Sequence, residues 1–432
     1  MIMRLATLSG IVCMALAILP LASCEKTHND DPEPNPPVIP VDPSDPDNPG
    51  ADGNVMTPTA AYTYIKNTAL DALARFNPED QREILQVSKS FVEIYGDYDM
   101  PYEFGDGYKS PAKLIGELGD AVSRHNPFGI TRASYDSSIS DFAGIYEPDT
   151  RAMRWIRTGD SESVVFRAPL DGQTVQIQAT PSDGEWSPDD ETGIPRKIVT
   201  TVTYGRTRLS SVSVNSFADL DRGIVNLNIV AEAANITATV RIDGSNSKIT
   251  ENGRLAVGGS EVVSGDIIIT GSRLCDVDAW ESEDDMSGML RDAILSLDFL
   301  DRVFVSAHAR DLENCMDALD SWYDSYDGVS QAQAEKEVTD ACRILNSSLT
   351  SEVRFAASGP VQASLYWMPY VYCYNNVTSG VDYWEVSPAA AVRYAYDGST
   401  ERIENVDFDF DIVADRLESL IGRYADFMRS LR

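Results

Sequence analysis

The spacing of apolar residues changes along the chain, and each change predicts a different kind of element. Between residues 57 and 136 apolar side chains recur every three or four positions, as they do on one face of a helix. Three pairs in this part, Thr57-Pro58, Asn77-Pro78 and Ser110-Pro111, place a capping residue before a proline, which is typical of helix starts. We therefore predict a helical N-terminal part over residues 57–136.

From residue 137 to about residue 280 the apolar period shortens to two. The segments 198–204, 225–231 and 236–242 alternate apolar with polar side chains, as half-buried strands do. Turn signals recur between such segments, at Asp171-Gly172, Tyr204-Gly205, Asp243-Gly244 and Asn252-Gly253. This pattern predicts an antiparallel β meander, folded as a sandwich or as a curved sheet.

Residues 281–432 return to helical spacing and then change again. We expect helices at 285–300, 303–326 and 330–349, of which the second and third would form an antiparallel hairpin that turns near Gly328. Tyrosine-rich strands follow between residues 353 and 396, and an amphipathic helix closes the chain. Strands followed by helices without regular alternation indicate an α+β fold. The three parts are compatible with one compact body over residues 57–432.

The first 56 residues do not read as part of this body. Residues 1–23 carry one charge, Arg4, before an apolar run, which is typical of a secretory signal peptide. The run ends in Leu21-Ala22-Ser23-Cys24, which matches the bacterial lipobox, whose cysteine receives a diacylglycerol anchor and a fatty acid such as palmitate. An ordinary signal peptide or a transmembrane helix is the alternative. Residues 24–56 are acidic and rich in proline, and are expected to form a disordered, extended tether.

The signal peptide, lipobox and acidic tether together resemble surface lipoproteins of the Bacteroidota. The resemblance covers residues 1–50 and implies acylation of Cys24 and an anchor in the outer membrane. It implies display on the extracellular face. The acidic stretch Asn29-Asp30-Asp31 stands farther from Cys24 than the export signal of that family, so the periplasmic face is the alternative. The body resembles no family.

Composition narrows the range of functions. The chain has 35 Lys and Arg against 68 Asp and Glu, a net charge of −33, which argues against a nucleic-acid partner. With three histidines, of which His125 and His308 lie in the body, a three-histidine zinc site is excluded and no cofactor is expected.

Cys315 and Cys342 would face each other across a helical hairpin and form a disulfide; two free buried thiols are the alternative.

Two clusters remain as candidate sites. Asp407, Asp409 and Asp411 have calcium-loop spacing, but Ile412 occupies the position that needs glycine, so a strand leading into a helix is the better interpretation. Aromatic residues are dense near the C-terminus, where alternate positions would share one face of a strand. The candidate ligand-binding residues are Tyr366, Tyr370, Tyr372, Tyr374 and Trp384. Such rings suit a sugar platform, or equally a sheet face covered by helices.

These features favour a lipid-anchored, non-enzymatic protein at the cell surface. Its partners would be membrane lipid, through acylated Cys24, and a glycan or a peptide, or it would be an accessory subunit of a surface assembly. The alternative is a hydrolase, a glycoside hydrolase or a peptidase, that uses paired carboxylates.

The lipid anchor can be tested at its attachment point. Cys24→Ala removes the acylated thiol, and the protein should move from the membrane fraction to the soluble fraction, because several acyl chains supply stable anchoring. Fractionation followed by immunoblotting measures this change. Retention of the variant in the membrane would contradict the lipoprotein interpretation.

Overall fold

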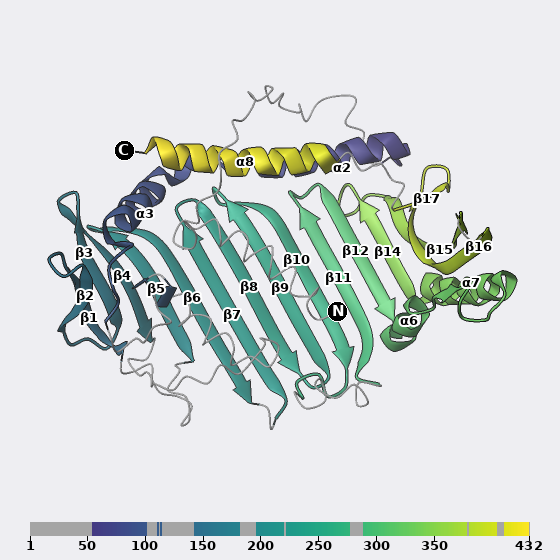
Figure 1. The fold of residues 1–432 in the computed structure, drawn as a ribbon, viewed down its shortest axis with the longest axis horizontal. Helices are drawn as coiled ribbons and strands as arrows, with labels where there is room; N and C mark the ends of the chain where they lie inside the picture. Colours follow the sequence, from purple (N-terminus) through teal and green to yellow (C-terminus); the bar gives the residue numbers. More distant parts are fainter. Residues whose placement is uncertain are drawn as a thin grey trace.

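A single curved antiparallel sheet forms most of the described chain (Figure 1). The computed structural model describes residues 54–101, 110, 111, 113, 114, 142–181, 196–219, 222–276, 288–377, 380–403 and 410–431. The strands within these ranges are β1 (Gly144–Asp149), β2 (Arg154–Gly159), β3 (Val164–Leu170), β4 (Gln173–Pro181), β5 (Lys197–Tyr204), β6 (Thr207–Asp219), β7 (Ile224–Ala233), β8 (Ile236–Ser245), β9 (Lys248–Val257), β10 (Ser260–Gly271), β11 (Leu290–Phe299), β12 (Val303–Arg310), β13 (Tyr323–Asp324), β14 (Leu349–Arg354), β15 (Val361–Asn376), β16 (Val381–Tyr394) and β17 (Thr400–Arg402).

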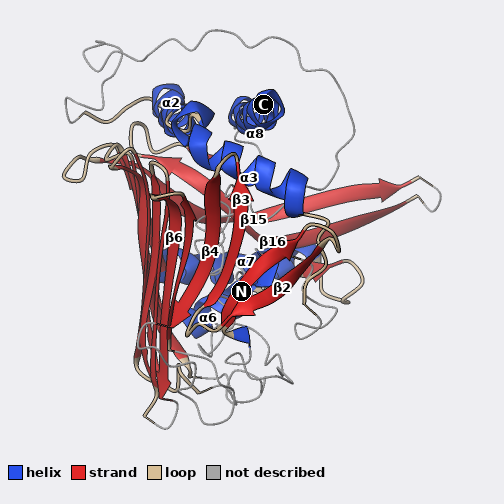
Figure 2. Cartoon of the chain, turned by 90° about the vertical axis from the view of Figure 1, so that its left-hand side faces the viewer, coloured by secondary structure: helices blue, strands red, loops and turns tan. Residues whose placement is uncertain are grey.

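The sheet confirms the predicted meander and the α+β class. From β3 to β12 each strand pairs antiparallel with the next one in the chain, and β14, β15 and β16 continue the sheet beyond β12. At the other end β1 lies between β2 and β3, parallel to β3. Of the two predicted shapes, the curved sheet is the one formed (Figure 2). β10 and β11 pair across residue 280, so the sheet continues from the second expected part into the third.

Half of the four predicted glycine turns are correct. Asp171-Gly172 and Tyr204-Gly205 connect β3 to β4 and β5 to β6, with positive φ at Asp171 and at both glycines. Asp243-Gly244 and Asn252-Gly253 are wrong, because they lie inside β8 and β9, paired on both sides.

Helices lie along one end of the strands (Figure 1). The predicted starts at Thr57 and Asn77 are confirmed: the hydroxyl of Thr57 accepts from the Ala60 N–H at the start of the helix Pro58–Ala74, and the side chain of Asn77 caps the short helix Pro78–Gln81 in the same way. Arg423 of the C-terminal helix donates to the carbonyl oxygen of Phe76, at 3.2 Å, which ties the closing helix to the first one. These elements are α2 (Pro58–Ala74), η2 (Pro78–Gln81), α3 (Arg82–Tyr95) and α8 (Phe410–Ser430).

The helices at 285–300 and 303–326 were wrong predictions. The first segment contains β11 and the second contains β12, followed by the short helix α6 (Leu312–Leu319). Both strands carry period-two patterns, and a positive-φ turn at Leu300 and Asp301 joins them. The edge of β10 supplies hydrogen-bond partners that override the moderate helix propensity of these segments. The third helix is confirmed as α7 (Gln331–Ser348), capped by Ser330.

The histidine and carboxylate candidates can now be placed. His308 lies on β12, not on a helix, between Ile294 of β11 and Thr350 of β14. Asp407 and Asp409 lie outside the described residues, as does the side chain of Asp411, and so do Cys24 and the whole N-terminal segment to residue 53. Among the described residues, no helix combines the length and the apolar character that crossing a membrane requires.

The main core lies where α3 meets the strands β1 to β4. Trp155 is 1% exposed and packs against Phe91, Tyr95 and Phe166, with ring centroids 5.2 to 6.1 Å apart. The Tyr95 hydroxyl donates to the carbonyl oxygen of Pro169 at 2.6 Å and thereby holds the helix on the sheet. Burial of such rings is the largest single contribution of side chains to stability in this region.

Trp155→Ala should lower the free energy of unfolding by about 3–5 kcal/mol, because it leaves a large cavity in this core. The matched control is Trp322→Ala, a surface tryptophan that is 47% exposed and should cost about 1 kcal/mol or less. Urea unfolding followed by circular dichroism measures both values. Equal losses in the two variants would contradict this assignment of the core.

Candidate binding surface

The hairpin of β15 and β16 carries the aromatic candidates on two different faces. Its register runs without a shift from Ala363, opposite Tyr394, to Asn376, opposite Val381. As predicted from their spacing, Tyr370, Tyr372 and Tyr374 share one face, and consecutive rings along the strand lie 6.5 and 5.8 Å apart. Trp367 and Val371 point to the other face, where α7 packs against them. The tip of the hairpin projects beyond the rest of the sheet (Figure 2).

Two further tyrosines extend the row across the hairpin. Tyr374 stacks on Tyr383 of β16, with centroids 5.3 Å apart and planes 19° apart. Tyr383 stacks in turn on Tyr326, which follows β13, at 5.1 Å and 28°. We call Tyr370, Tyr372, Tyr374, Tyr383 and Tyr326 the tyrosine face. Tyr372 and Tyr374 are 48% and 40% exposed and Tyr326 is 71% exposed, so none of the described helices or strands covers this surface.

The stacking determines what the tyrosine face presents to solvent. Centroids separated by 5.1 and 5.3 Å with nearly parallel planes are too close for rings lying flat side by side, so the rings overlap in offset stacks. Tyr374, Tyr383 and Tyr326 therefore cover parts of one another's flat faces, and the outer face of Tyr326 lies at the end of this stack. Tyr372 is tilted by 38° and 35° to its two neighbours in the row.

Arginines cover the rings at the other end. The guanidinium of Arg402 lies 4.2 Å from the centroid of Tyr370, and that of Arg393 lies 3.9 Å from the centroid of Tyr366. These are cation–π contacts within the chain. Tyr366, a sequence candidate, is thus engaged by Arg393 rather than joined to the stacked row.

Trp384 does not belong to this surface. It lies opposite Cys373 on β16 and packs with Val338 and Cys342 of α7. The sequence placed it among the candidates as a member of the dense aromatic cluster, but it directly follows Tyr383, and adjacent strand residues point to opposite faces.

Sequence reasoning missed Tyr326 and Trp322. Trp322 donates its indole N–H to Glu385 at 3.0 Å, and Glu385 lies opposite Tyr372 on the hairpin. Both residues fall in the segment 303–326, for which the sequence predicts a helix. A turn signal, Asp327-Gly328, and the surrounding aspartates were the available indication of a loop.

The expected disulfide between Cys315 and Cys342 is not formed. Both residues are free, buried thiols in neighbouring apolar clusters. The pairing assumed a long helical hairpin, whereas Cys315 lies on the short helix α6, next to β12. Burial raises the pKa of the Cys342 thiol to about 11, so it is protonated and behaves as a small apolar side chain.

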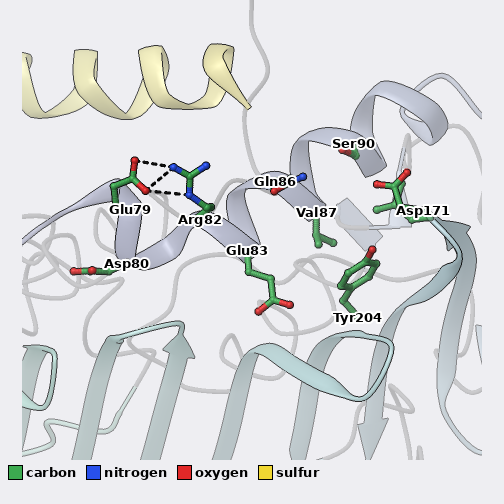
Figure 3. A pocket seen from close by; sticks show the side chains of 10 residues that line it. Glu79, Asp80, Arg82, Glu83, Gln86, Val87, Ser90, Asp171 and Tyr204 are labelled. Carbon is green, nitrogen blue, oxygen red and sulfur yellow. Dashed lines mark hydrogen bonds and ion pairs between the residues drawn. The ribbon is translucent and has the colours of Figure 1, made fainter. Parts of the chain in front are cut away.

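An open cavity of about 460 Å³ lies between η2, α3 and the sheet and offers several carboxylates (Figure 3). Glu79, Asp80, Glu83 and Asp171 line it, and all four are exposed. Glu79 is paired with Arg82 at 2.6 Å. A glycosidase requires one carboxylic acid in an apolar environment that raises its pKa. This cavity is open to water, and the carboxylates in it are solvated surface groups.

Within the described ranges, no three His, Cys, Asp or Glu side chains are grouped closely enough to hold a metal ion. No family model, curated protein or solved structure matches this chain. The tyrosine face is therefore the strongest candidate site that geometry alone identifies.

The hydroxyls of the tyrosine face form a measurable network. Partial desolvation, together with hydrogen bonds to Tyr374 and Tyr383, raises the pKa of Tyr326 to about 12. Because this side chain is 71% exposed, we assign most of the shift to the hydrogen bonds, which favour the neutral phenol.

Replacing Tyr374 and Tyr383 by phenylalanine keeps the ring stack and removes both hydroxyls. The pKa of Tyr326 should then fall from about 12 toward 10, whereas the surface control Tyr396→Phe should leave it unchanged. NMR titration of isotope-labelled tyrosine, assigned with Tyr326→Phe, measures this change. An unchanged pKa would assign the shift to desolvation instead.

Proposed function

We propose that this chain is a lipid-anchored, non-enzymatic protein of the outer membrane, displayed on the cell surface. In this proposal acylated Cys24 holds it to the membrane lipid and residues 24–56 act as a spacer. The body serves as an accessory subunit of a surface assembly and binds a protein partner through the tyrosine face.

The observation that carries the proposal is the exposed stack of tyrosine rings on a projecting hairpin. Tyrosine, tryptophan and arginine are the residues that concentrate binding energy in protein interfaces. Here the rings are held by one another before any partner arrives, so little side-chain entropy is lost on binding. Their outward hydroxyls and edges suit the mixed polar and apolar surface of a protein.

The same stacking makes a glycan the weaker candidate. A sugar ring binds against the flat face of an aromatic ring. Tyr383 is stacked between Tyr374 and Tyr326, and Arg402 lies over Tyr370, so these rings offer few open flat faces. A hydrolase finds less support still, since the open cavity beside α3 holds solvated carboxylates.

A photo-cross-linking amino acid can be placed on the hairpin in cells that display the lipoprotein. At position 374 it should yield a defined cross-linked protein species on a gel, because this ring lies at the centre of the proposed interface. At position 396 it should yield none. Tyr396 is a matched control, since it is also exposed (57%) but lies outside the tyrosine face.

Binding of the detergent-solubilised protein to a glycan array, lost in Tyr374→Ala and kept in Tyr396→Ala, would replace the protein partner by a glycan. Turnover in a panel of glycoside and peptide substrates would contradict a non-enzymatic role. Equal cross-linking at both positions would remove the tyrosine face from the function.

A further inference from the structure

One edge of the projecting hairpin has backbone groups without a strand partner. The N–H of Trp367 donates to the Asn346 side chain at 2.8 Å, and its carbonyl oxygen accepts from the same side chain at 2.7 Å. Trp367 therefore directs its backbone polar groups away from β16. In an antiparallel pair this direction alternates with period two, and the register of β15 with β16 has no shift. Val371, Cys373 and Asn375 therefore also direct their N–H and C=O groups outward.

Toward the root of the hairpin, the outward positions of both strands are occupied or blocked. On β15 the Leu365 N–H donates to Ser351, Trp367 is held by Asn346, and Pro369 has no N–H to offer. On β16 the carbonyl oxygen of Trp384 accepts from Ser325, and β13 and β17 cover the neighbouring positions. Among the described strands, β14 is the one that pairs with the outer side of β15, and it stops at Ala363. The stretch from Val371 to Asn375 is thus an open strand edge.

Carboxylates surround the tip of the hairpin, whereas the arginines Arg393 and Arg402 lie nearer its root, over Tyr366 and Tyr370. The sequence has no Lys or Arg in residues 311–335 or in residues 355–392, the two stretches that form the tip and the loop beside it. On the tyrosine side, Glu385 lies opposite Tyr372 and pairs with Asp324 of β13. Exposed Asp320 and Asp327 flank the same loop. An acidic surface with exposed aromatic rings fits cationic side chains, which both the carboxylates and the rings attract.

We infer that a partner adds an extended, basic segment to the edge of β15 as a further antiparallel strand. The outward N–H and C=O groups of Val371, Cys373 and Asn375 would pair with its backbone. Its alternate side chains would fall beside Tyr372 and Tyr374, on the tyrosine face, and there Lys or Arg would contact the rings. This inference rests on the proposed function and names the chemistry of the partner.

A second copy of the chain is the less favourable occupant. It would bring the same acidic tip to the edge, and each chain already carries a net charge of −33. Like charges placed opposite each other across a strand pair are destabilising. A basic partner segment gains from the charges that a second copy would oppose.

The test compares two substitutions at the same residue. Cys373→Pro removes the outward N–H at the centre of the edge and keeps the hydrogen bonds to β16. Pro369, four residues earlier on the same strand, lacks the equivalent N–H in the natural sequence. Cys373→Ala removes the exposed thiol and keeps the N–H.

The probe is a fluorescent peptide, Thr-Lys-Thr-Lys-Thr-Lys-Thr, titrated into the detergent-solubilised protein. Cys373→Pro should weaken binding about tenfold or more, because it deletes a backbone hydrogen bond and obstructs its neighbours. Cys373→Ala should stay within about twofold of the unmodified protein.

Further arms test the charge and the rings. The peptide with Glu in place of Lys, and the Lys peptide with N-methylated alternate amides, should both fail to bind. Tyr374→Ala should weaken the Lys peptide about three- to fivefold by loss of a cation–π contact, and Tyr396→Ala should have no effect. Circular dichroism and thermal melting of Cys373→Pro confirm that the body is intact.

The outcomes separate this inference from the proposed function. Equal binding by Cys373→Pro and Cys373→Ala, with weaker binding by Tyr374→Ala, would overturn strand addition and leave the tyrosine face as the binding surface. Absence of binding by the Lys peptide, equal binding of the Glu peptide, or a dimer in ultracentrifugation that Cys373→Pro abolishes would each overturn the basic partner. Position-specific cross-linking at residue 374 would then still support the proposed function, and its absence would remove it.

Discussion

The continuous antiparallel hydrogen bonding from β3 to β16 is the constraint on which the rest of the molecule depends. A single sheet has two faces, and alternate side chains along every strand must suit one face or the other. On one face the apolar side chains meet α2, α3 and α8, as Phe76, Trp155 and Leu420 show. The other face carries polar cross-strand pairs such as Asn252 with Asp266. The apolar residues in the middle of the chain recur with period two because strand side chains alternate between these two faces.

The hairpin of β15 and β16 also has one covered side and one side exposed to solvent, but different side chains occupy them. α7 covers the side that holds Trp367, Val371 and Trp384, so these side chains pack against the helix. The opposite side has no such cover, and the chain places tyrosines there, whose rings shield one another while their hydroxyls stay in contact with water. A row of leucines on that side would be insoluble, and a row of lysines would not stack. The tyrosine face thus follows from leaving one side of a projecting two-stranded sheet uncovered.

Sequence patterns predicted the fold where they were locally decisive. Proline after a capping residue marked the starts of α2 and η2, and alternation marked the strands from β5 to β10. They failed at β11 and β12, where alanine and leucine suit a helix and the neighbouring strand decides the outcome. For the candidate site, strand parity placed Tyr370, Tyr372 and Tyr374 together. It could not bring in Tyr326, because that ring reaches the row through the pairing of β13 with β16, and Tyr326 and Tyr383 are 57 positions apart in the sequence, a contact that no local pattern encodes.

Pro369 and Pro388 lie directly opposite each other in the hairpin, where neither can donate a hydrogen bond to a neighbouring strand. This pair divides the hairpin into a root, whose edges the body occupies, and a tip. Strand growth along β15 that begins at the tip must stop at Pro369, so it cannot spread into the main sheet. The open edge is therefore short, and the proline pair keeps strand addition at the tip from spreading along the sheet behind it.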